Sequence, residues 1–475
     1  MDFQYKFYIF NKNLQKKTEQ FSPWGELMKE RIGDTFMANI KAFRGYRYNT
    51  DKIDNLGSVI SPPYYNMTKE DKDALYDKSE YNSVRLFSGK KFESDTREEN
   101  TFTRAKNYLD KWIEDGILVR DEEPVIYMYE QTIEMYDTHY SNTSFVALVE
   151  LEEIGKGAIM PCEKPHEVSM LDRYELLKST NADMSMISCL YVEPEKELFN
   201  LMNELREEKP DLEFSSDDNV QQKIWKISYK PTIDFIIEHF KDLSLYITDG
   251  QTRYETCLQY RDYMKEHNPN HTGKEPYNYM MMSLSNAHSD GLVVLPVHRE
   301  VKTIKNFSES HFIAGAQDHF RVEKIIVDSN DETLVRTMVK QISTVKAETR
   351  IAAYCGGDYF YRMVLLDKDY IKNDVYPDMS KEYCNLDIVA LNKLIIDDVF
   401  HIDEEKYEDY VHSTRSYESC YRDIQDGKYD IMFIMNPVRV EQIRNITAMG
   451  ERLPEVTISV FPKPSVGVII NLKED

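Results

Sequence analysis

The sequence has few of the residues that mark the common nucleotide-binding, disulfide-bonded and zinc-binding proteins. Its 475 residues include only 17 glycines and six cysteines. None of the glycines falls in the Walker phosphate-loop pattern or in the dinucleotide-binding fingerprint, so the two most widespread nucleotide motifs are excluded. No two cysteines form a Cys-x-x-Cys pair, and structural zinc sites take their ligands in close pairs. We therefore expect reduced cysteines and no structural zinc.

Long apolar runs and an excess of positive charge are also missing. No stretch approaches the roughly 20 apolar residues of a membrane-spanning helix, and no secretory leader precedes the cysteines, so we expect a cytoplasmic protein with no membrane partner. Asp and Glu number 83 against 59 Lys and Arg, a formal net charge of −24. Because nucleic acids are bound mainly through Lys and Arg that neutralise phosphates, this balance argues against a nucleic-acid partner but leaves room for a local basic pocket. The oligomeric state is left open.

The composition is that of an ordinary globular chain with room for two or three domains. Hydrophobic residues make up 41% of it and aromatic residues 12%, which is enough for substantial cores. Strand-like and helix-like segments alternate from residue 37 onward, which is typical of an α/β fold with mixed sheets and flanking helices. We divide this part into an N-terminal α/β region (37–150), a central region (151–300) and a C-terminal α/β region (301–475).

Residues 1–36 show no sustained hydrophobic period, although they contain Phe7-Tyr-Ile-Phe10 and Trp24. Two interpretations are open: an extension of the protein, or a start codon assigned too far upstream. We expect low order in either case.

Hydrophobic periods predict the individual elements of the remaining chain. The pair Thr68 and Asp71 indicates a helix start, and Thr101–Asp115 has the spacing of an amphipathic helix. Val125–Ile133 and Ser144–Leu151 are β-rich runs predicted to pair antiparallel. Further strands are predicted at Met184–Val192, Leu243–Ile247, Tyr277–Leu284, Leu292–Val301 and Asp430–Met435, helices at Glu195–Glu208, Pro231–Phe240 and Arg253–His267, and a hairpin turn at Cys355–Asp358.

The most informative segment joins a predicted strand to the next helix and reads Thr248-Asp-Gly-Gln-Thr-Arg253. A strand-to-helix corner aims the free backbone N–H groups of the helix start at whatever lies above it. Gly250 lets that backbone approach closely, and Arg253 adds a fork of donors, so the corner suits a phosphate. An ordinary structural role stays open, because Thr252 and Glu255 match a capping box and Gly250 could simply supply a turn.

A second candidate segment follows the proline-bracketed loop Met160–Pro165, the kind of loop that often displays catalytic side chains. Glu167 could accept the proton of a substrate hydroxyl or hold magnesium, and His166 could contact a phosphate. A solvated pair of loop residues is the alternative. Arg173 stands at the start of a helical pattern, where it is either a phosphate ligand or a helix-surface charge.

A third candidate pair, His298 and Arg299, ends an apolar run that begins at Leu292. Active sites of α/β proteins gather at the carboxyl ends of strands, so this pair could face the same cleft as Asp249 and Arg253. A pair that only closes the end of a sheet fits the pattern equally well.

Several separated motifs, taken together and in order, resemble a bacterial family known as domain of unknown function 1015. The motifs are Ile40-Lys-Ala-Phe-Arg44, Ser61-Pro-Pro-Tyr64, Pro165-His-Glu167 with Asp172-Arg173, Asp249-Gly250 with Arg253-Tyr-Glu-Thr256, Leu295-Pro-Val-His-Arg299, Asn436-Pro-Val438, Gly450-Glu-Arg-Leu-Pro454 and Phe461-Pro-Lys463. In that family the corner usually reads Asp-Gly-His-His-Arg. This is similar to the phosphate-contacting motif of free L-serine kinases, relatives of the ParB and sulfiredoxin folds, so the resemblance implies a central region of that kind.

The resemblance also implies an enzyme that uses Mg²⁺ and ATP or ADP to phosphorylate a small hydroxyl compound, with L-serine as the expected acceptor. Catalysis would fall to Glu167, as base or metal ligand, and to His166. The phosphates or the nucleotide would be bound by Asp249, Gly250, Gln251, Thr252, Arg253, His298, Arg299 and Arg173.

The chain departs from the family at Gln251 and Thr252, which stand where two histidines are usual. The loss of preorganised donors at a phosphoryl group weakens its transfer. A second hypothesis is therefore a catalytically weakened paralogue that binds a nucleotide or phosphometabolite and has a regulatory role.

Overall fold

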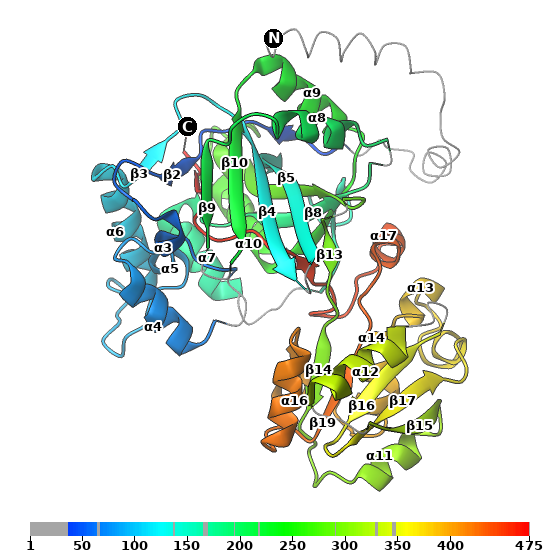
Figure 1. Cartoon of the computed structure of the whole chain (residues 1–475). Helices are drawn as coiled ribbons and strands as arrows, with labels where there is room; N and C mark the ends of the chain where they lie inside the picture. The colour runs from blue at the N-terminus through cyan, green and yellow to red at the C-terminus, as the bar shows by residue number, and fades with distance from the viewer. Residues whose placement is uncertain are drawn as a thin grey trace, which may run out of the picture.

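The computed structural model describes residues 37–63, 67–135, 138–164, 170–193, 195–216, 219–289, 291–327, 331–343 and 348–474. These residues form a large body and a small body, which two stretches of chain connect (Figure 1). The large body holds residues 37–294 together with the C-terminal residues from 460 onward, and the small body holds residues 298–448. The segment 1–36, for which we expected low order, lies outside the described residues.

A mixed sheet forms the centre of the large body, in the strand order β6-β11-β8-β12-β5-β4-β10-β9, with β1 beside β5. Most neighbours are antiparallel, whereas β11 lies parallel to β6 and β12 lies parallel to β8. The strands are β1 (Ile40–Lys41), β4 (Ile126–Met135), β5 (Thr138–Glu150), β6 (Ile159–Pro161), β8 (Ile187–Tyr191), β9 (Leu212–Ser215), β10 (Gln221–Ile227), β11 (Leu245–Asp249) and β12 (Tyr279–Asn286).

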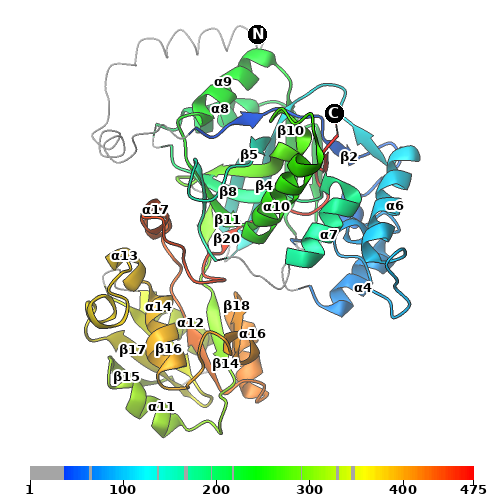
Figure 2. The same ribbon diagram turned by 180° about the vertical axis from the view of Figure 1, so that it is seen from behind.

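Both faces of this sheet are buried, and the alternation of side chains along β5 shows how. Phe145 and Val149 enter one core while Val146 and Leu148 enter the other, as the pleat of a strand requires. Figure 2 shows the helices over the first face, which are α7 (Met170–Thr180), α8 (Glu197–Leu205), α9 (Lys230–Phe240) and α10 (Gln251–His267). The second face is covered by residues 466–472 and by α3 (Leu56–Val59), α4 (Lys69–Lys78), α5 (Val84–Phe87) and α6 (Thr101–Glu114).

The small body is built on an antiparallel sheet in the order β15-β17-β16-β19-β14-β18. Its strands are β14 (His298–Val301), β15 (Phe320–Ile326), β16 (Arg350–Tyr354), β17 (Tyr359–Leu365), β18 (Val411–Thr414) and β19 (Ile431–Ile434). The buried strand β19 contributes side chains to the cores on both faces of this sheet. Ile431 and Phe433 enter one core, and Met432 and Ile434 enter the other.

Helices cover both faces of the small sheet as well (Figure 1). One core includes α12 (Asp331–Ser343) and α16 (Tyr417–Gln425). The other is closed by α11 (Glu309–Ala316), α13 (Lys381–Cys384), α14 (Asp387–Leu391), the π-helix η4 (Asn392–Asp397), α15 (Tyr407–Tyr410) and α17 (Val440–Ala448). Two short turns complete the elements, the 3-10 helix η2 (Pro276–Asn278) and the π-helix η3 (Ile371–Val375).

Short two-stranded pairings tie distant parts of the chain to the large body. They are β2 (Tyr46–Tyr48) with β3 (Leu118–Arg120), β13 (Val293–Val294) with β20 (Val460–Phe461), and β7 (Ala182–Asp183) with β21 (Asn471–Leu472). The last two pairings bring the chain back from the small body, so the C-terminal residues pack in the large body and not beside their sequence neighbours.

The predicted mixed α/β class is confirmed, and most predicted elements form. Thr68 and Asp71 make the capping box at the start of α4, with Thr68 Oγ1 accepting from Asp71 N at 3.1 Å. Strands β4 and β5 pair antiparallel as expected. Gly356 and Gly357 take left-handed backbone angles in the turn between β16 and β17. The division into three regions stays a prediction.

One predicted strand, Leu292–Val301, is wrong. The run divides into β13, which pairs with β20, and β14, which belongs to the small sheet. Pro296 stands at the break, where it has no N–H to give to a sheet ladder. The apolar run is therefore the crossing between the two bodies. Among the described residues, no helix is long and apolar enough to cross a membrane.

Candidate functional site

The strand-to-helix corner forms as the sequence indicates. Strand β11 ends at Asp249, and Gly250 caps the first turn of α10 with a φ of +97°. A Cβ atom at Gly250 would lie 2.8 Å from Nη2 of Arg253. The left-handed backbone favours glycine here, and the absence of a Cβ atom lets the Arg253 guanidinium group lie directly against the backbone.

The capping box that we considered at Thr252 does not form. The helix begins one residue earlier, at Gln251, and its N-cap is Gly250, with no side-chain hydrogen bond to the helix start. Glu255, the other member of the expected box, accepts a hydrogen bond of 3.0 Å from Nη1 of Arg452. The N-cap of α10 is therefore a glycine, which has no side chain that could bond to the helix start.

Asp249 lies between two cations at this corner. Its Oδ2 accepts from Nη2 of Arg253 at 2.8 Å, and its Oδ1 accepts from Nζ of Lys463. Burial by itself raises the pKa of Asp249, but the charges of Lys463 and Arg253 outweigh it and lower this pKa to about 2. Asp249 is therefore a carboxylate at neutral pH, and Lys463, which is almost fully buried, is its long-range partner.

Arg253 is held in place by further bonds. Its Nη1 donates to the carbonyl oxygen of Met186 at 2.9 Å and to Oγ of Ser185. Because both acceptors lie just before β8, the guanidinium group is fixed between two neighbouring strands of the large sheet.

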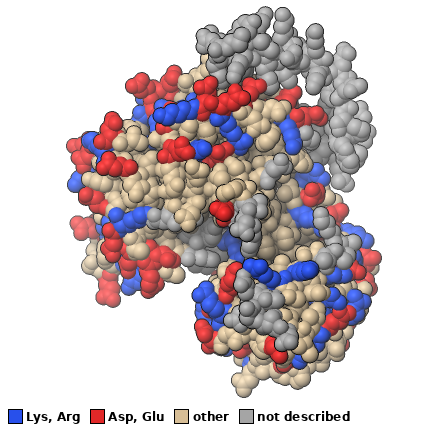
Figure 3. All heavy atoms as spheres, viewed as in Figure 1, with Lys and Arg blue, Asp and Glu red and all other residues tan. Residues whose placement is uncertain are grey.

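A pocket of about 190 Å³ opens above the corner, and we call it the corner pocket. It is lined by Pro63, Glu163, Lys164, Arg173, Ser185, Met186, Asp249, Gly250, Gln251, Thr252, Arg253, Glu455, Val456, Lys463, Pro464 and Val466. The predicted residues 249–253 and Arg173 thus meet in one place. Figure 3 shows acidic and basic side chains mixed over one face of the molecule, with several basic ones beside the hollow between the two bodies.

The two positions that depart from the family pattern differ in their surroundings. Gln251 is buried, and its Nε2 donates to the carbonyl oxygen of Ile247 at 2.9 Å. Thr252 is partly exposed at the wall of the corner pocket. The amide of Gln251 is thus bonded to the preceding strand, away from the helix start.

Glu163, which was not among the predicted site residues, also lines the corner pocket. Its Oε1 accepts from the backbone N–H groups of Thr457, at 2.7 Å, and Ile458. Burial raises its pKa to about 7, although those two hydrogen bonds lower it. Its position inside the proline-bracketed loop was the available signal, but the partners at 457 and 458 are almost 300 residues away and carry no local pattern.

The loop residues His166 and Glu167 lie in segment 165–169, outside the described residues. Lys164, directly before this segment, and Arg173, four residues after it, both line the corner pocket. The catalytic roles expected of His166 and Glu167 stay predictions.

His298 and Arg299 do not join the corner pocket, contrary to the cleft we expected. His298 is fully buried in the small sheet, where its Nδ1 accepts from Met435 N at 3.2 Å. Burial, with a smaller effect of Arg299, lowers the pKa of His298 to about 3. The physical reason is the crossing at Pro296, which places β14 in a different sheet from β11.

The guanidinium group of Arg299 uses all of its donors in hydrogen bonds to neighbouring residues. Its five N–H bonds meet the hydroxyl of Tyr407 and the carbonyl oxygens of Val297, His298, Glu455 and Val456. No N–H of Arg299 is left for a phosphate, so its role in this structure is to hold backbone carbonyls.

The Mg²⁺ implied by the resemblance can be tested against the donors present. Among the described ranges, no group of three or more His, Cys, Asp or Glu side chains is arranged to hold a metal. A Mg²⁺ ion that accompanies a nucleotide needs only about one or two protein carboxylates, because phosphates and waters fill its other positions. Asp249 fits as one such ligand, since it is ionised and lines the corner pocket.

Fold and pocket together define a mixed α/β protein with a cationic pocket at a strand-to-helix corner. The chain belongs to the family described as protein of unknown function (DUF1015), whose family model matches residues 40–389. This match confirms the family resemblance of the sequence motifs. A search of curated proteins finds no match.

Solved structures similar to this chain share little sequence with it. A conserved hypothetical protein from Pyrococcus furiosus has 11% identity and a TM-score of 0.33, over 68% of this chain and 93% of that chain. A free serine kinase in complex with AMP has 9% identity and a TM-score of 0.32, over 66% and 86%. SbnI with a C-terminal truncation, from Staphylococcus aureus, has 10% identity and a TM-score of 0.30, over 69% and 82%. At these values the similarities carry no argument about activity.

Proposed function

We propose that the corner pocket binds the phosphates of ATP or ADP and that the protein transfers a phosphoryl group to a small hydroxyl metabolite, for which L-serine is the first acceptor to test. The observation that supports this most directly is the start of α10, whose N-cap is a glycine. Gly250 opens it toward a pocket that also holds Arg253 and Lys463.

The start of α10 has the properties of an anion site. The first intrahelical bond is donated by Tyr254 N to Gly250 O at 2.9 Å, so the N–H groups before it have no partner within the helix. In a helix of 17 residues, the aligned peptide dipoles add partial positive charge at this end. Arg173 and Lys164, which pairs with Glu404 at 2.8 Å, also line the pocket wall.

Asp249 regulates the charge of this pocket in the proposed function. It neutralises part of the charge of Arg253 and Lys463, and a bound phosphate would compete with it for both cations. A Mg²⁺ ion beside Asp249 would remove this competition and supply the positive charge that phosphoryl transfer requires. Glu167 is proposed as the base for the substrate hydroxyl, and His166 as a phosphate contact, on the family resemblance alone.

A second function is favoured by one specific observation. The Gln251 amide donates to Ile247 O, so one of its two N–H groups points to the preceding strand at a position where the family usually has a histidine. The geometry of the corner pocket would also suit a protein that binds the nucleotide without transferring phosphate and that has a regulatory role.

One experiment separates these functions. The purified protein is incubated with Mg²⁺, ATP or ADP, and L-serine, and O-phosphoserine is measured by mass spectrometry, while nucleotide binding is followed by thermal shift. The phosphotransferase proposal expects product, together with about 2.7 kcal/mol of stabilisation at a hundredfold excess of nucleotide over its dissociation constant. Binding without product supports the regulatory function, and absence of binding contradicts both.

The matched variants are Arg253→Ala and Lys265→Ala. Both remove a cation from α10, but Arg253 lines the corner pocket and Lys265 lies in the last turn of the helix. Arg253→Ala should abolish the nucleotide-induced shift, because charge-assisted hydrogen bonds contribute about 1.5–3 kcal/mol each. Lys265→Ala should leave the shift unchanged.

A further inference from the structure

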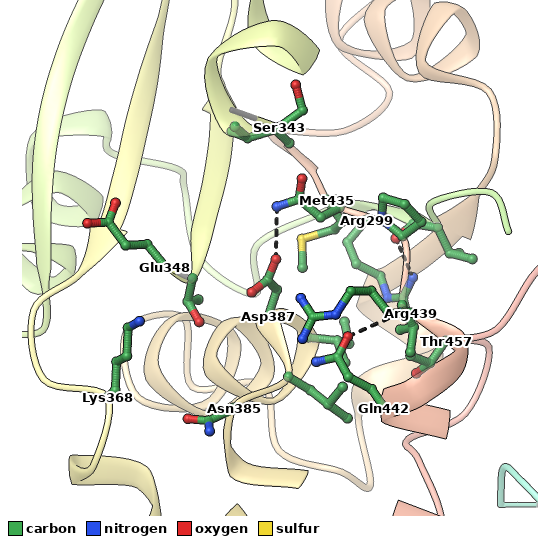
Figure 4. Close-up of a pocket in the computed structure, with 18 residues that line it drawn as sticks. Arg299, Ser343, Glu348, Lys368, Asn385, Asp387, Met435, Arg439, Gln442 and Thr457 are labelled. Atoms are coloured by element: carbon green, nitrogen blue, oxygen red, sulfur yellow. Dashed lines mark hydrogen bonds between the residues drawn. The ribbon is translucent and has the colours of Figure 1, made fainter. Parts of the chain in front are cut away.

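A second cavity, of about 400 Å³, is lined mainly by the small body, together with Val297 and Thr457 of the two connecting stretches, and we call it the small-body cavity (Figure 4). No described residue lines both it and the corner pocket. Its walls come from the start of β14, the end of α12, the starts of α14 and α17, and the loop after β19. Stretches far apart in sequence thus converge on one space, of the size that small-molecule sites have.

Asp387 is the carboxylate in the interior of this cavity. It opens α14, accepts a hydrogen bond of 2.9 Å from Nδ2 of Asn436, and receives a further one from Thr349. Burial raises its pKa to about 6, against the opposing effects of these hydrogen bonds and of the positive charges of Arg439 and Lys368. Asp387 is still mostly ionised at neutral pH, and it makes no ion pair with a described residue.

The other carboxylate of the cavity is already neutralised. Glu348 is paired with Arg350, whose Nη2 lies 2.7 Å from Oε2 of Glu348. Among the described residues that line the cavity, Asp387 is therefore the acidic group that can receive a cation from a ligand. A buried carboxylate without a cationic partner is costly, and a bound ammonium group would offset that cost.

Two cations stand at the rim of the same cavity. Figure 4 shows the guanidinium group of Arg439 in the same part of the cavity as the Asp387 carboxyl group, with Lys368 to one side. Both positive charges act on the pKa of Asp387, yet neither forms an ion pair with it. Both side chains are exposed, so they can meet the anionic end of a ligand whose cationic end lies deeper.

The remaining lining suits a small polar molecule. Amide side chains of Asn385, Asn436 and Gln442 can donate and accept hydrogen bonds. Apolar side chains fill the surface between them, namely Ile342, Leu386, Ile388, Met435 and Val438. A ligand here would be oriented by charge at its two ends and packed against apolar surface along its length.

We propose that the small-body cavity is a binding site for a zwitterionic metabolite of the α-amino acid class, whose ammonium group is bound by Asp387 and whose carboxylate is bound by Arg439 and Lys368. This site is independent of the proposed phosphotransferase function. It predicts a small-molecule ligand even for a protein in which the corner pocket transfers no phosphate.

The experiment is calorimetry and thermal shift of the full chain with each of the common L-amino acids and with O-phospho-L-serine. At least one should bind, and its N-acetyl and carboxamide derivatives should bind more weakly, because each lacks one of the two charges. Asp387→Asn keeps the shape and the bond to Asn436, and should weaken binding about tenfold to a hundredfold, the range expected for a charge-assisted hydrogen bond. Lys368→Gln, at the exposed rim, should weaken binding without affecting folding.

Arg253→Ala separates this site from the corner pocket and should leave amino acid binding unchanged. The proposal is overturned by any of three results. These are no binding of any compound at millimolar concentration, binding that is equally tight in folded Asp387→Asn, or binding that is lost in Arg253→Ala.

Discussion

Arg299 donates a hydrogen bond of 2.9 Å from Nη2 to the carbonyl oxygen of Val456, a β-branched residue with a φ of +48°. The segment around Val456 separates the two cavities, because Glu455 and Val456 line the corner pocket while Thr457 lines the small-body cavity. Glu163 holds the same segment from the other side through Thr457 N and Ile458 N. An unfavourable backbone angle is thus maintained by a buried cation and a buried carboxylate from different bodies.

Arg299→Lys should destabilise the protein by about 3 kcal/mol or more. A lysine cannot reproduce the fork that meets four carbonyl oxygens and Tyr407, and buried groups that lose their partner cost about 1–3 kcal/mol each. Arg321→Lys is the control, because Arg321 is exposed and pairs with Glu323 at the surface. The measurement is the free energy of unfolding in urea, and equal losses in the two variants would contradict the role given to Arg299.

Val456→Asn should stabilise the protein by about 1 kcal/mol, since asparagine tolerates a left-handed backbone better than valine does. Little apolar contact is lost, because 38% of Val456 is exposed. Val456→Thr keeps the β-branched shape and is the matched control, for which we expect no gain. Similar unfolding free energies for both variants would show that the backbone angle stores no strain.

Because the pKa of Asp249 is lowered in the folded protein, we expect the protein to lose stability in acid. Its folded-state pKa of about 2 lies below the ordinary value of 3.8, so its contribution is present above about pH 4 and is lost as the pH falls toward 2. A shift of this size corresponds to about 2 kcal/mol. Asp249→Asn should flatten this part of the stability curve, and Asp234→Asn, on the exposed surface of α9, should not. A curve left unchanged by Asp249→Asn would remove the ion pairs as its cause.

For Glu163 we expect the opposite dependence of folding stability on pH. Its folded-state pKa of about 7 lies above the ordinary 4.5, so the stability it provides is full below about pH 4.5 and is lost as the pH rises through 7. Glu163→Gln keeps an oxygen for Thr457 N and Ile458 N but cannot ionise, and should be relatively more stable than the parent above pH 7. Glu163→Ala should lose stability at every pH, and parallel curves for parent and Glu163→Gln would contradict the raised pKa.

Restoring the family's histidines tests the departure at the corner. Gln251→His with Thr252→His should increase phosphorylation of L-serine by about 10²–10³-fold, by analogy with single preorganised donors in other transfer sites. No helix cap is lost at Thr252, but the bond from Gln251 to Ile247 O is, at a cost of about 1 kcal/mol. Gln251→Ala controls for that loss. A folded double variant that binds nucleotide without product would favour the regulatory function.

The local order of the chain was readable in its sequence. Hydrophobic period and capping residues are sufficient to predict α4, α6, α10 and the β4–β5 pair, because each depends on contacts within a short stretch. The corner at Asp249–Arg253 is of the same kind, since a strand, a glycine and a helix start follow one another directly. Family membership also follows from sequence, through motifs that keep their order.

Only the tertiary structure decided which of these motifs share a site. Lys463 reaches Asp249, and Glu163 meets Thr457, across more than 200 residues, and no periodic pattern records such partners. His298 and Arg299 are a further example. Their sequence predicted that they belong to a strand, but it did not predict which sheet contains that strand. A strand's own sequence determines which of its faces is apolar, whereas its neighbours depend on where the chain crosses and returns, here at Pro296 and after residue 448. That long-range pairing places His298 and Arg299 away from the corner pocket and brings Glu163 and Lys463 into its lining.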